Sequence, residues 1–309
     1  MNKKYLPLLL FFSVCLIWGT TWIAMEMAVA TIPPILATGL RFLIAAPILI
    51  FIAYKLKQPL LFPKPQQKWM LLVAICYFAI PFTLMIFGEQ YISSGLAAII
   101  FANMPIAVMV VSALFLNLRL SVHQVVGLLI AVISLCSILM NEMKIGGEDY
   151  LIGSLALGGA VIMHALTYVM IQKHCKNIKV FTYNALPCLI AAICLLATSA
   201  LVETPNIHSF TVESISSVLY LGVIAGVGGV AAYFKLNEIS SPFTASICFL
   251  LFPIVALTLS SFLSSHTVSK ASILAMLPLL GGILLTKTEK TFWLKRFKVK
   301  KSPALSWEK

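Results

Sequence analysis

The chain has 309 residues, of which 61% are apolar and 10% charged, and its mean hydropathy is +1.01. These values lie outside the range of soluble globular domains and exclude that class. The formal net charge of +12 is spread over short connections and a basic tail. We therefore expect it to contact anionic lipid headgroups and not nucleic acid.

Long apolar stretches follow one another along the chain, each close to the roughly 20 residues that a helix needs to cross a bilayer. We expect an all-α integral membrane protein with ten transmembrane helices. The expected spans are 5–27, 33–54, 69–88, 93–116, 122–140, 151–171, 180–201, 214–234, 242–263 and 270–286.

The first two spans contain polar residues that need an explanation. Trp18, Trp22 and Glu26 recur every fourth residue and share one helical face. Arg41 lies within the second span, where a charge costs roughly 2.5–3.5 kcal/mol unless it has a partner or faces water. An antiparallel hairpin would bring Glu26 near Arg41. Three interpretations of Arg41 stay open: it lines a central cavity, forms a structural ion pair, or extends its head to the surface.

The fourth and ninth spans each contain a proline, Pro105 and Pro253, and each proline frees a backbone carbonyl one turn earlier. Because the two occupy similar places in the two halves of the chain, we expect a shared structural bend. Asn103 adds a polar group near the middle of the fourth span.

His164 lies near the centre of the sixth span. It titrates near neutral pH in water, so it is a candidate for carrying a proton or binding a substrate. Glu26 is a second candidate for proton coupling. A buried histidine bonded to a backbone carbonyl is the alternative. Tyr168 and, in the eighth span, Tyr233 supply further aromatic surface that would suit an amphipathic small molecule.

The eighth span also contains Gly222 and Gly226, at the spacing of a close helix–helix contact. Either close packing alone or a moving helix would explain them.

Two halves of the chain echo one another. Ile92-Ser93-Ser94 recurs as Ile239-Ser240-Ser241, 147 positions later, and Leu43-Ile44-Ala45-Ala46 recurs as Leu189-Ile190-Ala191-Ala192, 146 positions later. With five spans in each half, the second half would be inverted relative to the first and would enclose a central cavity. We expect repeats over 1–145 and 146–289, followed by a basic cytoplasmic tail over 290–309.

The basic residues predict an orientation. If the N-terminus is cytoplasmic, 19 of the 22 Lys and Arg residues lie on that side, whereas Lys144 and Lys270 lie outside and Arg41 lies within a span. Glu89 and several other acids gather on the external side. Both termini would then be cytoplasmic in a multi-pass protein of a bacterial inner membrane.

No hydrolase, nucleotide-binding or metal motif occurs in the sequence, so an enzyme, a cofactor and an ATP-driven pump lack support. Instead, the chain resembles the EamA-type transporters of the drug/metabolite transporter superfamily over about residues 5–286. The resemblance is carried by the motifs Trp18-Gly19-Thr20-Thr21-Trp22, Arg41-Phe42, Ile92-Ser93-Ser94-Gly95-Leu96-Ala97 with Pro105, and Ser240-Ser241 with Pro253. The sixth helix of the family often has an aromatic residue where His164 stands here. The resemblance implies helices around a central cavity and transport of amino acids, related metabolites or toxic compounds, most often outward.

The leading hypothesis is an alternating-access carrier that exports a small amphipathic, amino-acid-like metabolite. Its site would be lined by Trp18, Trp22, Arg41, Asn103, His164, Tyr168 and Tyr233. Two alternatives stay open: an uptake carrier of the same fold, and a lipid-carrier flippase or non-transporting scaffold. The sequence leaves the coupling ion and the oligomeric state open.

Overall fold

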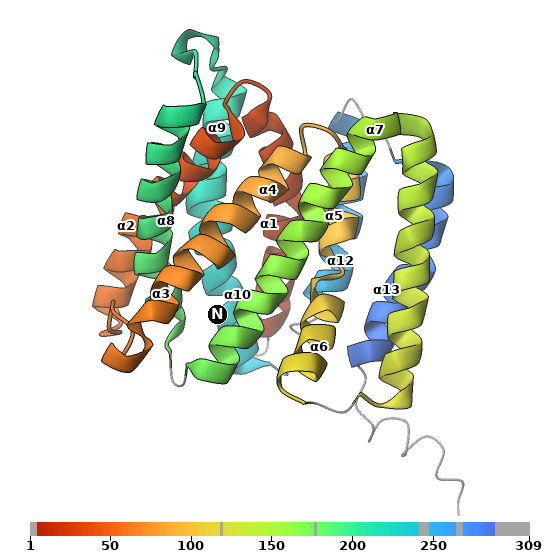
Figure 1. The fold of residues 1–309 in the computed structure, drawn as a ribbon, viewed down its shortest axis with the longest axis horizontal. Coiled ribbons are helices and arrows are strands. Elements are labelled where there is room, and N and C mark those ends of the chain that lie inside the picture. Colours follow the sequence, from red (N-terminus) through yellow and green to blue (C-terminus); the bar gives the residue numbers. More distant parts are fainter. Residues whose placement is uncertain (1–4, 118–119, 176–177, 241–246, 264–267, 288–309) are drawn as a thin grey trace, which may run out of the picture.

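The protein is a bundle of helices, seen in a computed structural model that describes residues 5–117, 120–175, 178–240, 247–263 and 268–287 (Figure 1). The expected tail over 290–309 and Ser241 lie outside these residues. In chain order the helices are α1 (Leu6–Val29), α2 (Pro34–Lys55), η1 (Lys64–Gln66), α3 (Gln67–Val73), η2 (Ala74–Ala79), α4 (Ile80–Gly88), α5 (Ser94–Phe101), α6 (Met104–Phe115), α7 (Val122–His174), α8 (Val180–Val202), η3 (Ile207–Ser209), α9 (Val212–Tyr220), η4 (Leu221–Gly229), α10 (Val230–Ile239), α12 (Cys248–Leu263) and α13 (Lys270–Lys287).

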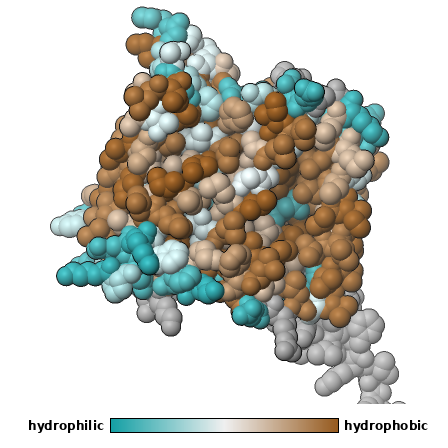
Figure 2. All heavy atoms as spheres, in the orientation of Figure 1, coloured by the Kyte–Doolittle hydropathy of each residue, from teal (hydrophilic) through white to brown (hydrophobic). Residues whose placement is uncertain are grey.

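Eight stretches of the described residues are long and apolar enough to cross a membrane, and two shorter apolar helices follow them, at Cys248–Leu263 and Lys270–Thr286. The prediction of a multi-pass helical membrane protein is therefore confirmed. Apolar side chains cover most of the face seen in Figure 2, and hydrophilic ones gather toward the two ends.

Consecutive segments combine into single crossings. Two of them contain a π-helical stretch: η2 lies between α3 and α4, and η4 lies between α9 and α10. The helix α7 continues through the polar run that joins the halves of the chain, and it bends at the top of Figure 1, from where its two arms diverge downward. Its apolar stretches are separated there, between Lys144 and Glu148.

Two helix pairs make the most extensive contacts of the bundle. The first arm of α7 meets α13 at two glycines: a Cβ added to Gly127 would lie 2.6 Å from the Gly282 carbonyl. The second pair is α2 and α8, where Gly39 lies against Leu195 and Leu196. Small residues let helix backbones approach closely, which favours packing in a membrane.

Glutamates at one end of the bundle, the upper end in Figure 1, bind the N-termini of neighbouring helices. We call this the acidic end. Glu203 accepts from two N–H groups at the start of α2, each at 2.9 Å. Glu142 accepts from Ser269, which precedes α13, at 3.0 Å, and Glu26 accepts from Ser94 of α5 at 3.1 Å. A carboxylate satisfies the free N–H groups of a helix start and opposes its positive dipole.

Candidate functional site

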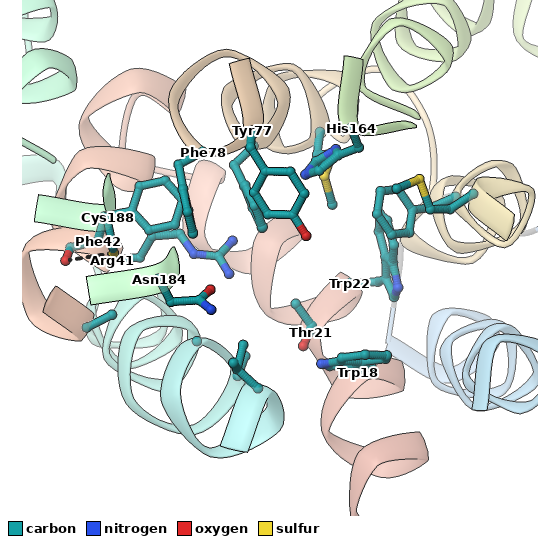
Figure 3. Close-up of a pocket in the computed structure, with 18 of the residues that line it drawn as sticks. Trp18, Thr21, Trp22, Arg41, Phe42, Tyr77, Phe78, His164, Asn184 and Cys188 are labelled. Atoms are coloured by element: carbon teal, nitrogen blue, oxygen red, sulfur yellow. Dashed lines mark hydrogen bonds between the residues drawn. The ribbon is translucent and has the colours of Figure 1, made fainter. Parts of the chain in front are cut away.

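A cavity of about 210 Å³ lies in the middle of the bundle and is walled mainly by apolar and aromatic side chains (Figure 3). It is lined by Trp18, Thr21, Trp22, Arg41, Phe42, Ala45, Leu49, Tyr77, Phe78, Phe82, Met85, Phe101, Met104, His164, Asn184, Cys188, Ala225, Gly226, Val230, Phe249 and Phe252.

Two tryptophans of α1 form one wall. The ring of Trp18 lies 5.5 Å from that of Phe249, and the ring of Trp22 lies 5.3 Å from that of Phe101. The close approach of Trp18 to η4 requires a glycine, because a Cβ on Gly229 would lie 2.9 Å from Trp18 Nε1. Such rings offer a flat apolar surface with an indole N–H as a polar group.

Arg41 is buried, with 3% of its surface exposed, and its guanidinium points into the space between the helices (Figure 3). Its Nη1 donates to Met25 Sδ at 3.5 Å, its Nε has no hydrogen-bond partner, and the group lies 5.0 Å from the centre of the Phe82 ring. Among the described residues, the one ion pair within 4.0 Å lies on α10. Arg41 therefore faces the cavity without a carboxylate partner at that distance.

Close packing fixes the backbone of Arg41. A Cβ added to Gly222 of η4 would lie 2.9 Å from the Arg41 carbonyl oxygen. Gly222 therefore packs α2 against η4, which agrees with the close-packing interpretation of the glycines. The alternative of a moving helix stays untested.

His164 lies in an aromatic box, 2% exposed. The centroids of the Tyr77, Phe82 and Phe101 rings are 4.7, 5.3 and 5.7 Å from that of the imidazole. Nδ1 is 3.0 Å from the Ala160 carbonyl oxygen. Because a carbonyl only accepts, Nδ1 carries the hydrogen, which leaves Nε2 as an acceptor in the neutral ring. His164 thus makes the backbone hydrogen bond that the structural interpretation expects, and it also lines the cavity.

Four of the seven residues expected to bind substrate line the cavity: Trp18, Trp22, Arg41 and His164. The other three lie outside its lining. The amide nitrogen of Asn103 donates back to the Ile99 carbonyl at 3.0 Å. Tyr168 is 47% exposed on α7, and the ring of Tyr233 packs behind Trp18 at 4.8 Å.

The two expected bends differ. The helix breaks between α5 and α6, and Pro105 occupies the first turn of α6, where a proline needs no N–H partner. Pro253 lies inside the continuous helix α12.

Sequence reasoning missed several lining residues, above all Asn184 and Thr21. Asn184 of α8 donates to the Val180 carbonyl at 2.7 Å and projects toward the cavity in Figure 3. Thr21 lies three residues after Trp18 on the same face. The signal available for Asn184 was an isolated amide in an otherwise apolar span, which is the same signal that Asn103 gives.

Comparison with known proteins identifies the family. Residues 6–140 and 151–288 each match the EamA-like transporter family. The chain belongs to this family. The PagO protein of Salmonella typhimurium is 48% identical over 278 residues, which cover 90% of this chain and 91% of PagO. An uncharacterized transporter of Buchnera aphidicola subsp. Schizaphis graminum is 44% identical, with 92% and 94% covered.

More distant matches also cover most of the chain. A Salmonella typhimurium protein named a probable amino-acid metabolite efflux pump is 23% identical, with 87% of this chain and 91% of that protein covered. A solved crystal structure with 20% identity superposes with a TM-score of 0.64 over 95% of this chain and 98% of the other, which shows a shared fold. The family and the names of these relatives indicate a membrane transporter and not an enzyme.

Proposed function

We propose that the protein is a secondary transporter that exports a small amphipathic, amino-acid-like metabolite by alternating access. The observation that carries the proposal is Arg41, a buried guanidinium that faces an aromatic cavity without a carboxylate partner within 4.0 Å among the described residues. A buried cation without a partner is costly, and an anionic ligand would offset that cost.

The cavity walls favour a ligand with two parts. Trp18, Trp22 and Phe252 offer flat apolar surfaces, which suit an aromatic or aliphatic body. Arg41 offers a planar fork of donors that matches a carboxylate. An amino acid with an apolar side chain, or a related acid, combines both features.

Repeat-related residues meet around the cavity, which supports two inverted five-helix repeats in a ten-helix protein. Trp18 and His164 are separated by 146 positions, and Phe101 and Phe249 by 148, close to the offsets of the sequence echoes. All four line the cavity. Two inverted halves that enclose one site can open it to either side in turn.

The π-helical stretches add to this support. Ala74–Ala79 and Leu221–Gly229 begin 147 positions apart and occupy the third and eighth crossings. Such stretches occur often at functional sites, where they disturb the regular helix. In this chain both contribute residues to the cavity lining, including Tyr77 and Ala225.

The distribution of charge supports an inner-membrane orientation with both termini cytoplasmic. Export is supported by the name of one distant relative, a probable amino-acid metabolite efflux pump. The direction of net movement depends on the gradients, so an uptake carrier of the same fold is the alternative. A polar group as deep as Arg41 favours either carrier over a scaffold with an apolar, occluded centre.

Three compounds with one phenyl body test the substrate class in proteoliposomes: phenylacetate, L-phenylalanine and phenethylamine. We expect uptake into preloaded vesicles of the two carboxylates and not of the amine. Arg41→Ala should strongly lower that uptake, whereas Lys235→Ala, in an exposed ion pair on α10, should leave it unchanged. Equal uptake of all three compounds, or full activity of Arg41→Ala, would overturn the proposal.

A further inference from the structure

Glu89 is a buried acid that caps no helix. It follows the last residue of α4 at the acidic end and is 4% exposed, and neither of its carboxylate oxygens has a hydrogen-bond partner. By contrast, Glu26, Glu142 and Glu203 at the same end each accept from backbone N–H groups. Helix capping therefore accounts for these three acids and not for Glu89.

Burial without a hydrogen bond penalises an ionised carboxylate strongly and a neutral carboxylic acid much less. The surroundings of Glu89 are therefore those of a group that binds a proton. The neighbouring acid, Glu26 of α1, has the same effect, because two nearby carboxylates repel each other when both are ionised.

Arg41 of α2 acts on Glu89 in the opposite sense, since its positive charge stabilises the ionised carboxylate. The two groups attract each other without forming an ion pair within 4.0 Å. The helix α7 presents apolar contacts to this end of α4, where Leu157 packs against Gly88. The titratable groups of η2 and α7 nearest the cavity, Tyr77 and His164, contact each other further along the bundle, and His164 packs on Phe82 of α4.

Glu89 lies just beyond the cavity. Met85, one helical turn earlier on the same face of α4, lines the cavity, and so does Arg41. Arg41 therefore lines the cavity and is also near enough to the Glu89 carboxylate to act on its charge.

We propose that Glu89 is a proton-binding site that controls the availability of Arg41. When Glu89 is ionised, it attracts the guanidinium and competes with an anionic ligand. When Glu89 binds a proton, its charge is neutralised and the Arg41 guanidinium is available to bind the ligand. The proposal rests on the proposed function in taking Arg41 as the group that binds substrate.

Two consequences follow from linkage. Because a proton at Glu89 favours the anion at Arg41, the anion must favour the proton equally. Binding of an anionic ligand should then take up a proton, and the affinity should fall by up to about tenfold for each pH unit in the range where Glu89 is ionised. A cationic ligand of the same size should show neither effect.

The test uses the full chain in lipid nanodiscs and measures phenylacetate binding by calorimetry from acidic to alkaline pH. Proton uptake is obtained by repeating the titration in buffers of different ionisation enthalpy. We expect the wild type to bind more tightly at acidic pH and to take up a proton. Glu89→Gln, which stays neutral, should bind tightly at every pH and take up none.

Glu142→Gln is the matched control, because it changes a buried acid at the same end and keeps an oxygen that accepts from Ser269. It should retain both the pH dependence and the proton uptake. A wild type that binds phenylacetate equally at every pH would overturn the inference and leave the proposed function standing.

Infrared spectroscopy tests the proton site without a ligand. A protonated carboxylic acid has a carbonyl band that disappears on ionisation. In the wild type and in Glu142→Gln, the pH titration of this band should contain a component that is absent in Glu89→Gln. An unchanged titration in Glu89→Gln would overturn the inference. Absence of phenylacetate binding together with loss of that component would instead contradict the proposed substrate class and leave Glu89 as a proton site.

Discussion

The Cys188 thiol donates to the Phe42 carbonyl oxygen at 3.6 Å, and the two residues are separated by 146 positions (Figure 3). The same offset separates the echo Leu43-Ile44-Ala45-Ala46 from Leu189-Ile190-Ala191-Ala192. Around a two-fold axis, residues beside the axis meet their own equivalents. The contact is therefore the one expected if α2 and α8 are inverted copies that pack across such an axis.

Replacement of Arg41 tests its role in the cavity. Arg41→Ala should lower transport of a carboxylate substrate by roughly ten- to a hundredfold, since a hydrogen bond to a charged group contributes about 1.5–3 kcal/mol. Arg41→Lys should rescue only part of the activity, because a point charge does not replace a planar fork. The measurement is initial uptake into proteoliposomes at equal protein content. Wild-type activity in Arg41→Ala would assign the residue a dispensable role.

Variants of His164 distinguish a residue that contacts the substrate from one that carries a coupled proton. If Glu89 binds the proton, His164→Gln should weaken gradient-driven transport and gradient-free exchange together, because the variant changes only the cavity wall. Transport is measured with and without a pH gradient. Selective loss of the gradient-driven mode would instead make His164 the proton carrier. His164→Trp, which restores the residue type of its repeat partner Trp18, should retain any gradient dependence.

Two adjacent glycines of α13 provide a matched pair for helix packing. A Cβ on Gly282 would lie 2.7 Å from the Gly127 carbonyl oxygen, whereas nothing lies within 4 Å of a Cβ on Gly281. Gly282→Ala should therefore destabilise the protein by about 1–3 kcal/mol, the cost of overpacking, and Gly281→Ala should not. Thermal unfolding in detergent measures both. Equal melting temperatures would contradict the close contact between α7 and α13.

Capping at the acidic end is testable at Glu203. Its carboxylate accepts from the N–H groups of Ile35 and Leu36 and from the Ser199 hydroxyl. Glu203→Ala should cost about 0.5–2 kcal/mol, the range of a lost N-cap. Glu213→Ala, at an exposed position in the first turn of α9, is the comparison and should cost less. Thermal unfolding in detergent measures the stability of both variants. A larger loss of stability in Glu213→Ala than in Glu203→Ala would refute the capping role of Glu203.

The outline of the fold was predictable because the length of an apolar stretch is set by the bilayer. Trp18, Trp22, Arg41 and His164 were identifiable for a related reason: a charge or an amphipathic ring within a span needs an interior surface. Asn103 was also predicted, but it lies outside the lining, at the break before Pro105. Asn103 and Asn184 both bond to their own helix, so an isolated amide within a span does not by itself mark a position in the cavity.

Glu89 illustrates a second limit. The charge pattern places it at the external end with other acids, and nothing in the sequence distinguishes it from those that cap a helix. Its burial depends on how α1, α2 and α7 close over the end of α4. The π-helical stretches had no sequence signal either, and each changes which side chains its helix presents to the cavity.

The most direct measurement compares metabolite pools inside and outside cells that express the wild type or Arg41→Ala at equal levels. We expect one or more small amphipathic acids to shift from the internal to the external pool with the wild type and not with Arg41→Ala. Identical pools in the two strains would contradict export through the Arg41 cavity.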